Sequence, residues 1–175
     1  MLFQRLRQGF VLGACCAFAA PLLAIEPTPT HPPAIVNARP QRRAQQMFRI
    51  IRADALRIHL ASQRLKESAK KSDFAQAGKE LSTIEPNVKD MENRLARLKA
   101  MPLEDAQWDR HRLEASAPLI SEIEKTRNRL HALLDNQGPR ADPRVSRSAE
   151  NYAENLMRQS QELEDAASAA GLGLS

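Results

Sequence analysis

The chain has 175 residues, which suits one domain together with processing segments. Aromatic residues make up 4% of the chain and charged residues 27%, and there are only 6 glycines, a composition that favours long amphipathic helices over β-sheet. The formal net charge of +5 is mild, and basic residues alternate with acidic ones along most of the chain, so nucleic acid is not an expected partner.

Residues 1–24 have the pattern of a secretory signal peptide. Arg5 and Arg7 form a basic start, and residues 10–24 are apolar or small. This apolar run is shorter than the roughly 20 residues that span a membrane comfortably. Cleavage is expected after Ala19 or after Ala24, and retention as an N-terminal membrane anchor is the alternative. We therefore expect a periplasmic or secreted protein.

The cysteines, Cys15 and Cys16, both lie inside this signal. The stretch that ends at Cys15 also resembles the lipobox of bacterial lipoproteins, in which the cysteine carries a lipid. The basic start lies close to Cys15 and the apolar run continues past it, and both features favour an ordinary signal peptide over lipidation. Once the signal is removed, the chain has no thiol for a disulfide, a metal site or a nucleophile.

Residues 25–40 are predicted to form a linker. This stretch contains five prolines, Pro27, Pro29, Pro32, Pro33 and Pro40. Proline removes a backbone donor and favours extended polyproline-like conformations, which are typical of a linker or stalk.

The rest of the chain predicts four helices, over residues 41–70, 73–100, 103–136 and 143–170. They lie in a helical region that spans residues 41–171, and residues 172–175 follow it as a tail. In the first two helices, apolar residues recur at alternating steps of three and four, which places them on one face of a helix. The first helix has Ala44, Phe48, Ile51, Ala55, Ile58, Ser62, Leu65 and Ala69 on this face, and the second has Phe74, Ala77, Leu81, Ile84, Val88, Met91, Leu95 and Leu98.

The two later helices have less regular apolar faces. The face of the third helix consists of Leu113, Ala117, Ile120, Ile123, Leu130 and Leu134, and that of the fourth consists of Val145, Ala149, Tyr152, Leu156, Leu163, Ala167 and Ala170. Residues at the helix ends support the same division. Ser72 or Asp73 is placed to cap the second helix, Pro102 suits the first turn of the third, and the Asp142-Pro143 pair suits the start of the fourth.

Four helices of similar length with short connections predict an all-α fold, an antiparallel up-down-up-down four-helix bundle. A long coiled-coil oligomer is the alternative. Pro86 and Pro118 lie inside the second and third helices, at nearly equal distances from the turn at residues 101–102. We expect both helices to bend there at one level. The bends either preserve the packing or open a pocket or hinge.

The motifs that carry chemistry in helical bundles are missing from this sequence. It has no Glu-x-x-His pair for a di-iron site, no His-Glu-x-x-His and no Cys-x-x-Cys-His for covalent haem. It also lacks a Gly-x-Ser-x-Gly elbow and a Walker-type glycine loop. We therefore predict a protein that is not an enzyme, with no cofactor and no catalytic or metal-binding residue. His59 and His131 are expected to flank the core.

Candidate contact residues lie at two places. Arg42, Arg43, Arg49 and Arg52 form the one basic concentration, which either faces solvent or makes weak contact with an anionic envelope surface. Trp108 either caps one end of the core or anchors a partner. The expected function is that of an exported, non-catalytic interaction or structural module in the bacterial cell envelope, with a protein partner or self-association. The alternative is a periplasmic bundle that binds a small ligand or cofactor.

Overall fold

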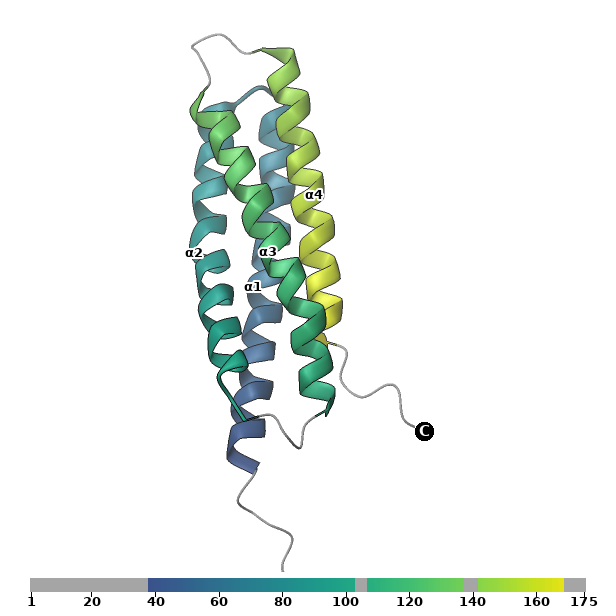
Figure 1. The fold of residues 1–175 in the computed structure, drawn as a ribbon. Helices are drawn as coiled ribbons and strands as arrows, with labels where there is room; N and C mark the ends of the chain where they lie inside the picture. Colours follow the sequence, from purple (N-terminus) through teal and green to yellow (C-terminus); the bar gives the residue numbers. More distant parts are fainter. Residues whose placement is uncertain (1–37, 103–106, 137–141, 169–175) are drawn as a thin grey trace, which may run out of the picture. The chain divides into compact units, whose positions relative to one another are not determined.

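The structure is a computed structural model that describes residues 38–102, 107–136 and 142–168. The described residues form four α-helices and no β-strand, which confirms the predicted all-helical class (Figure 1). The helices are α1 (Ala38–Lys70), α2 (Phe74–Lys99), α3 (Gln107–Asp135) and α4 (Pro143–Ser168). The predicted signal peptide, most of the linker and the tail lie outside the described residues.

The starts of α1 and α2 differ from the sequence prediction, that of α2 by one residue because Asp73 caps the helix. Helix α1 begins at Ala38 rather than at residue 41, so Pro40 lies in its first turn. Proline is tolerated there because the first amides of a helix have no partner within the helix. Helix α3 begins at Gln107. The preceding residues 103–106, which were predicted to belong to this helix, lie outside the described part.

Aspartates cap α2 and α4, because a carboxylate oxygen accepts from the free amides at a helix start. Of the two candidates for α2 it is Asp73 that acts, and its Oδ1 accepts from the Gln76 amide at 2.9 Å. Ser72 instead adopts a positive φ of 55° in the turn and shares a hydrogen bond with Ser146 of α4 at 2.8 Å between the hydroxyls. At the start of α4, Oδ1 of Asp142 accepts from the Arg144 amide at 2.8 Å.

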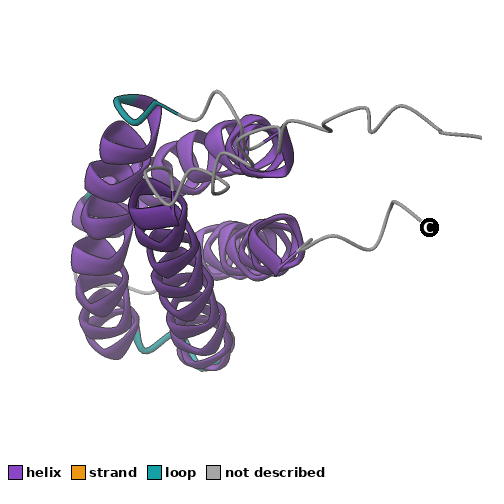
Figure 2. Cartoon of the chain, turned by 90° about the horizontal axis from the view of Figure 1, so that it is seen from below, coloured by secondary structure: helices purple, strands orange, loops and turns teal. Residues whose placement is uncertain are grey.

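Each helix turns its apolar face into a shared core. Helix α1 contacts α2 and α4, and α3 contacts the same two helices. The four helices lie around a common centre when the chain is seen from below (Figure 2). All eight predicted face positions of α1 are fully buried, including the hydroxyl-bearing Ser62. In α2 the predicted positions from Ala77 to Leu98 are buried and Phe74 is half-buried.

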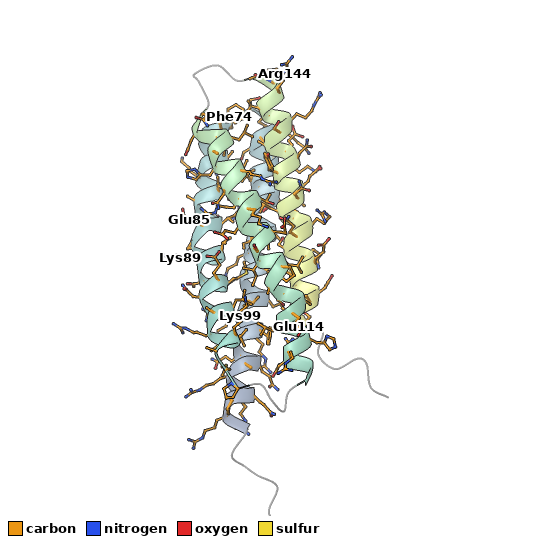
Figure 3. The ribbon with its side chains drawn as sticks, viewed as in Figure 1. Phe74, Glu85, Lys89, Lys99, Glu114 and Arg144 are labelled. Carbon is orange, nitrogen blue, oxygen red and sulfur yellow. The ribbon has the colours of Figure 1, made fainter. Side chains whose placement is uncertain are left out.

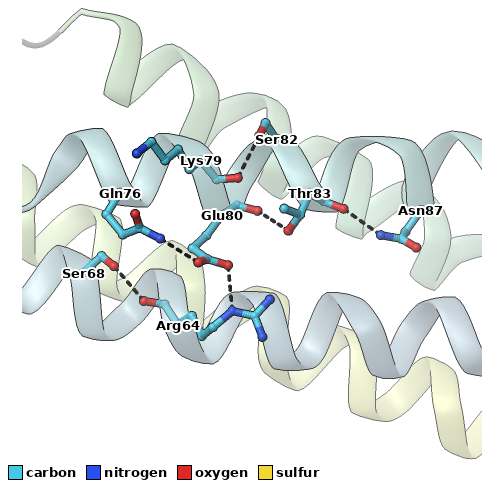
Figure 4. Close-up of polar contacts among 8 residues, drawn as sticks. All are labelled: Arg64, Ser68, Gln76, Lys79, Glu80, Ser82, Thr83 and Asn87. Atoms are coloured by element: carbon cyan, nitrogen blue, oxygen red, sulfur yellow. Dashed lines mark hydrogen bonds and ion pairs between the residues drawn. The ribbon is translucent and has the colours of Figure 1, made fainter.

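Polar contacts cross between the helices at the edge of this core. Nε of Arg64 in α1 donates to Oε2 of Glu80 in α2 at 2.8 Å, and Gln76 donates to the other oxygen of Glu80 at 2.8 Å (Figure 4). On the other side of α1, Lys66 pairs with Glu154 of α4 at 2.7 Å. These contacts fix which turns of neighbouring helices meet.

Candidate functional site

The predicted basic residues all lie exposed on α1. Arg52 is engaged, because its guanidinium donates to Oε1 of Glu164 in α4 at 3.0 and 3.1 Å. Among the described residues, Arg42, Arg43 and Arg49 form no ion pair. Trp108 lies in the first turn of α3, and its side chain is outside the described part. The basic cluster is therefore the part of the predicted site that the structure describes.

Both internal prolines are exposed, and their helices continue through them. Glu85, the neighbour of Pro86, pairs with Arg127 of α3 at 3.7 Å. Arg127 lies well beyond Pro118 along α3, so this contact gives no support to a shared level. A hollow of about 100 Å³ between α2 and α3 includes Glu85 and Arg127 in its lining. This volume is small beside the 300 Å³ or more of most ligand pockets.

Two histidines, His59 and His131, have hydrogen-bonding or ion-pair partners. Nδ1 of half-buried His59 lies 3.1 Å from the carbonyl oxygen of Met157, and its Nε2 lies 3.1 Å from the Gln63 amide nitrogen. A neutral ring that donates from Nδ1 and accepts at Nε2 satisfies both contacts. His131 pairs with Asp135 of its own helix at 2.7 Å. In the described part of the chain, no group of three or more His, Cys, Asp or Glu side chains is arranged to hold a metal ion.

An open groove of about 440 Å³ runs between α1 and α4. His59 and Met157 line it together with charged residues of both signs, namely Lys66, Glu154, Arg158 and Glu162. The hydrogen bond between Lys66 and Glu154 raises the pKa of the lysine and lowers the pKa of the glutamate, so both stay charged at neutral pH. The rim is polar and solvent-accessible, as the rims of protein–protein interfaces are.

Sequence reasoning missed a buried polar cluster on α3. Asp109 is fully buried and lies 3.8 Å from the Arg112 guanidinium. Arg112 in turn donates to the Ala167 carbonyl of α4 and lies over the Phe48 ring of α1, 4.2 Å from its centroid. Burial raises the pKa of Asp109 to about 6, although the positive charge of Arg112 acts in the opposite direction. The cluster therefore joins three helices.

A second buried carboxylate lies between α1 and α2. Asp54 is 2% exposed, and Oδ1 accepts from Arg57 at 2.7 Å while Oδ2 lies 3.8 Å from Arg94. Burial raises the pKa of Asp54, and the two arginines oppose the shift. Between α2 and α3, burial and the neighbouring Glu124 likewise raise the pKa of Glu92. Neither group was visible in the apolar pattern, because that pattern counts only apolar residues.

The described helices present exposed surfaces for contact, and polar side chains link neighbouring helices. Exposed charged side chains extend along the helices, for example Lys89, Lys99 and Glu114 (Figure 3). None of the described helices combines the length and the hydropathy needed to cross a membrane. No protein-family model, no curated protein and no solved structure matches this chain.

Proposed function

We propose that the protein is exported and acts as a non-catalytic interaction or structural module in the bacterial cell envelope. The observation that carries this function is the open groove between α1 and α4, which presents Met157 and a rim of both charges to a partner. The signal-like residues 1–24 support export to the periplasm or beyond, with anchoring by the uncleaved segment as the alternative.

We also propose that the four helices alternate in direction, up-down-up-down. Two ion pairs support this order for α1 and α2, because Asp54 lies near Arg94 whereas Arg64 lies near Glu80. The residue number rises from 54 to 64 in α1 while that of the paired residue falls from 94 to 80 in α2, as expected for two antiparallel helices. Arg52 with Glu164 and Lys66 with Glu154 give the same support for α1 and α4.

Bends in α2 at Pro86 and in α3 at Pro118 belong to the same proposal. Each proline lacks an amide hydrogen and crowds the preceding turn, which favours a bend in a continuous helix. Both prolines face solvent, where a bend leaves the core contacts in place. The pairing of Glu85 with Arg127 favours bends at different levels.

Photo-crosslinking in cells of the native bacterium tests the interaction. A photoreactive amino acid at Gln161, which is exposed and lines the groove, is expected to capture a partner protein or a second copy. The same amino acid at Asn93, which is exposed on α2 away from the groove, serves as the matched control. Equal capture at both positions, or none at Gln161, would contradict the proposed contact. An absorbance spectrum with a bound chromophore would instead favour the cofactor-binding alternative.

A further inference from the structure

Helix α1 carries a second regular row of side chains, which faces solvent. Its members, here named the outer strip, recur at alternating steps of three and four and are all exposed: Arg42, Gln46, Arg49, Ala53, Leu56 and Leu60. This spacing keeps them on one side of the helix. The buried face of α1 begins two residues later, at Ala44, so the strip is the side of α1 turned away from the core. It is about 27 Å long at 1.5 Å per residue.

The outer strip has a strongly basic end. In α1 the first carboxylate is Asp54, which is buried against arginines, and the next is Glu67 beyond the strip, paired with Lys70 at 3.1 Å. Arg42 and Arg49 form no ion pair with any described residue, and the exposed Arg39 and Arg43 lie beside them. This surface therefore favours an anionic partner.

The other end of the strip is apolar. Leu56 is 46% exposed and Leu60 is 44% exposed, and they are the large hydrophobic residues that stand out as exposed in the described part of the chain. A hollow of about 270 Å³ beside Leu60 is lined by Arg57 and Arg64, whose side chains are 65% and 58% exposed although each has a carboxylate partner. Exposed leucine thus lies between two further arginines.

We propose that the outer strip binds the surface of a membrane that contains anionic phospholipid. Arginines that lie along one line match a plane of phosphate groups, and leucines on the same line can enter the headgroup boundary, as in amphipathic helices that lie on membranes. A second copy of the chain would bring like charges together across this surface. Nucleic acid would use the arginines but leave the leucines exposed.

Vesicle sedimentation with the full chain tests this binding. The protein is expected to bind vesicles of equal phosphatidylglycerol and phosphatidylcholine at least about ten-fold more tightly than vesicles of phosphatidylcholine alone, since each basic residue near an anionic surface adds roughly five-fold. Any binding by the apolar residues 10–24 is common to all variants and does not depend on residues of α1. Equal binding to both vesicles would overturn the proposal and leave an acidic protein as the partner.

Paired variants locate the contact. The change Arg42→Gln/Arg49→Gln is expected to weaken binding to anionic vesicles about ten-fold or more, because it removes two charges from the strip. The control Arg97→Gln/Arg129→Gln removes two exposed charges from α2 and α3 and is expected to change binding less than about two-fold. Equal losses would show attraction by net charge alone and overturn the assignment to the strip.

The leucines give an independent readout. We expect Leu56→Gln/Leu60→Gln to weaken binding several-fold while the dependence on salt stays that of the wild type, since the charges are intact. Circular dichroism checks that each variant keeps its helices. Unchanged binding in a folded leucine variant would overturn the insertion of these side chains.

Discussion

Buried polar side chains are the residue-level feature that sets this bundle apart from a simple apolar core. Asp109, Arg112, Ser116 and Thr126 occupy buried positions of α3 between its apolar residues. Neither oxygen of the Asp109 carboxylate accepts a hydrogen bond within the described residues. An ionised group in such a place is costly, because burial removes its hydration.

Because of this cost, we expect the unfolding free energy to depend on pH through Asp109, and this dependence tests the burial of its carboxyl group. Its pKa is about 6 in the folded chain, above the ordinary aspartate pKa of 3.8, so the folded state binds the proton more tightly. The contribution of Asp109 to stability is therefore most favourable below pH 3.8 and is lost as the pH rises through 6. Relative to Asp109→Asn, the wild type should gain about 2–3 kcal/mol in unfolding free energy from pH 8 to pH 4.

Urea unfolding followed by circular dichroism at the two pH values measures this change. The comparison uses the difference between variant and wild type, so that other groups that titrate over the same range cancel. A difference that stays constant from pH 8 to pH 4 would show that Asp109 does not carry the raised pKa.

Ser62 offers a second test within the core. It is fully buried on the apolar face of α1, and its hydroxyl has no hydrogen-bond partner in the described part of the chain. Ser62→Ala should raise the unfolding free energy by about 1 kcal/mol, because it removes an unsatisfied polar group. Thermal unfolding measures the gain. The control is Ser68→Ala. The Ser68 hydroxyl donates to the Arg64 carbonyl at 3.0 Å, so its removal should raise the unfolding free energy less. The reverse order of the two variants would contradict this reading.

At the level of elements, the cap of α2 has a defined contribution. Asp73→Ala should lower the unfolding free energy by about 1 kcal/mol, because the Gln76 amide loses its acceptor. Chemical unfolding measures the loss. Asn93→Ala, at an exposed interior position of the same helix, should be neutral or stabilising because alanine favours helix. A neutral Asp73→Ala would mean that solvent caps this helix equally well.

Elements with a regular and almost wholly apolar row could be predicted from the sequence, and those whose row includes several polar residues could be predicted only in part. Every predicted face position of α1 is buried, because hydrophobic burial and helical period agree there. In α3 the row is completed by Asp109, Arg112, Ser116 and Thr126, which no apolar pattern includes. Their burial depends on partners in other helices, such as Phe48 of α1, and these pairings arise only on packing.

The candidate site, too, could be predicted from the sequence only in part. The basic residues of α1 were visible as a run of arginines, and their exposure follows from the phase of the buried face. The exposed leucines and the groove between α1 and α4 were missed. Both depend on which sides of two packed helices remain uncovered, and a single-helix pattern does not contain that information.

At the level of the whole molecule, the helices pack within one chain, with α1 against both α2 and α4. Coupling with a zero-length carbodiimide followed by mass spectrometry tests this packing most directly. Lys66 and Glu154 lie 2.7 Å apart across α1 and α4, close enough to form an amide. We expect their crosslinked peptide in the monomer fraction, and its loss in Glu154→Gln. Packing of α1 against α4 within one chain would be contradicted if this crosslink occurred only between two chains, or if Lys66 coupled only to neighbours in α1.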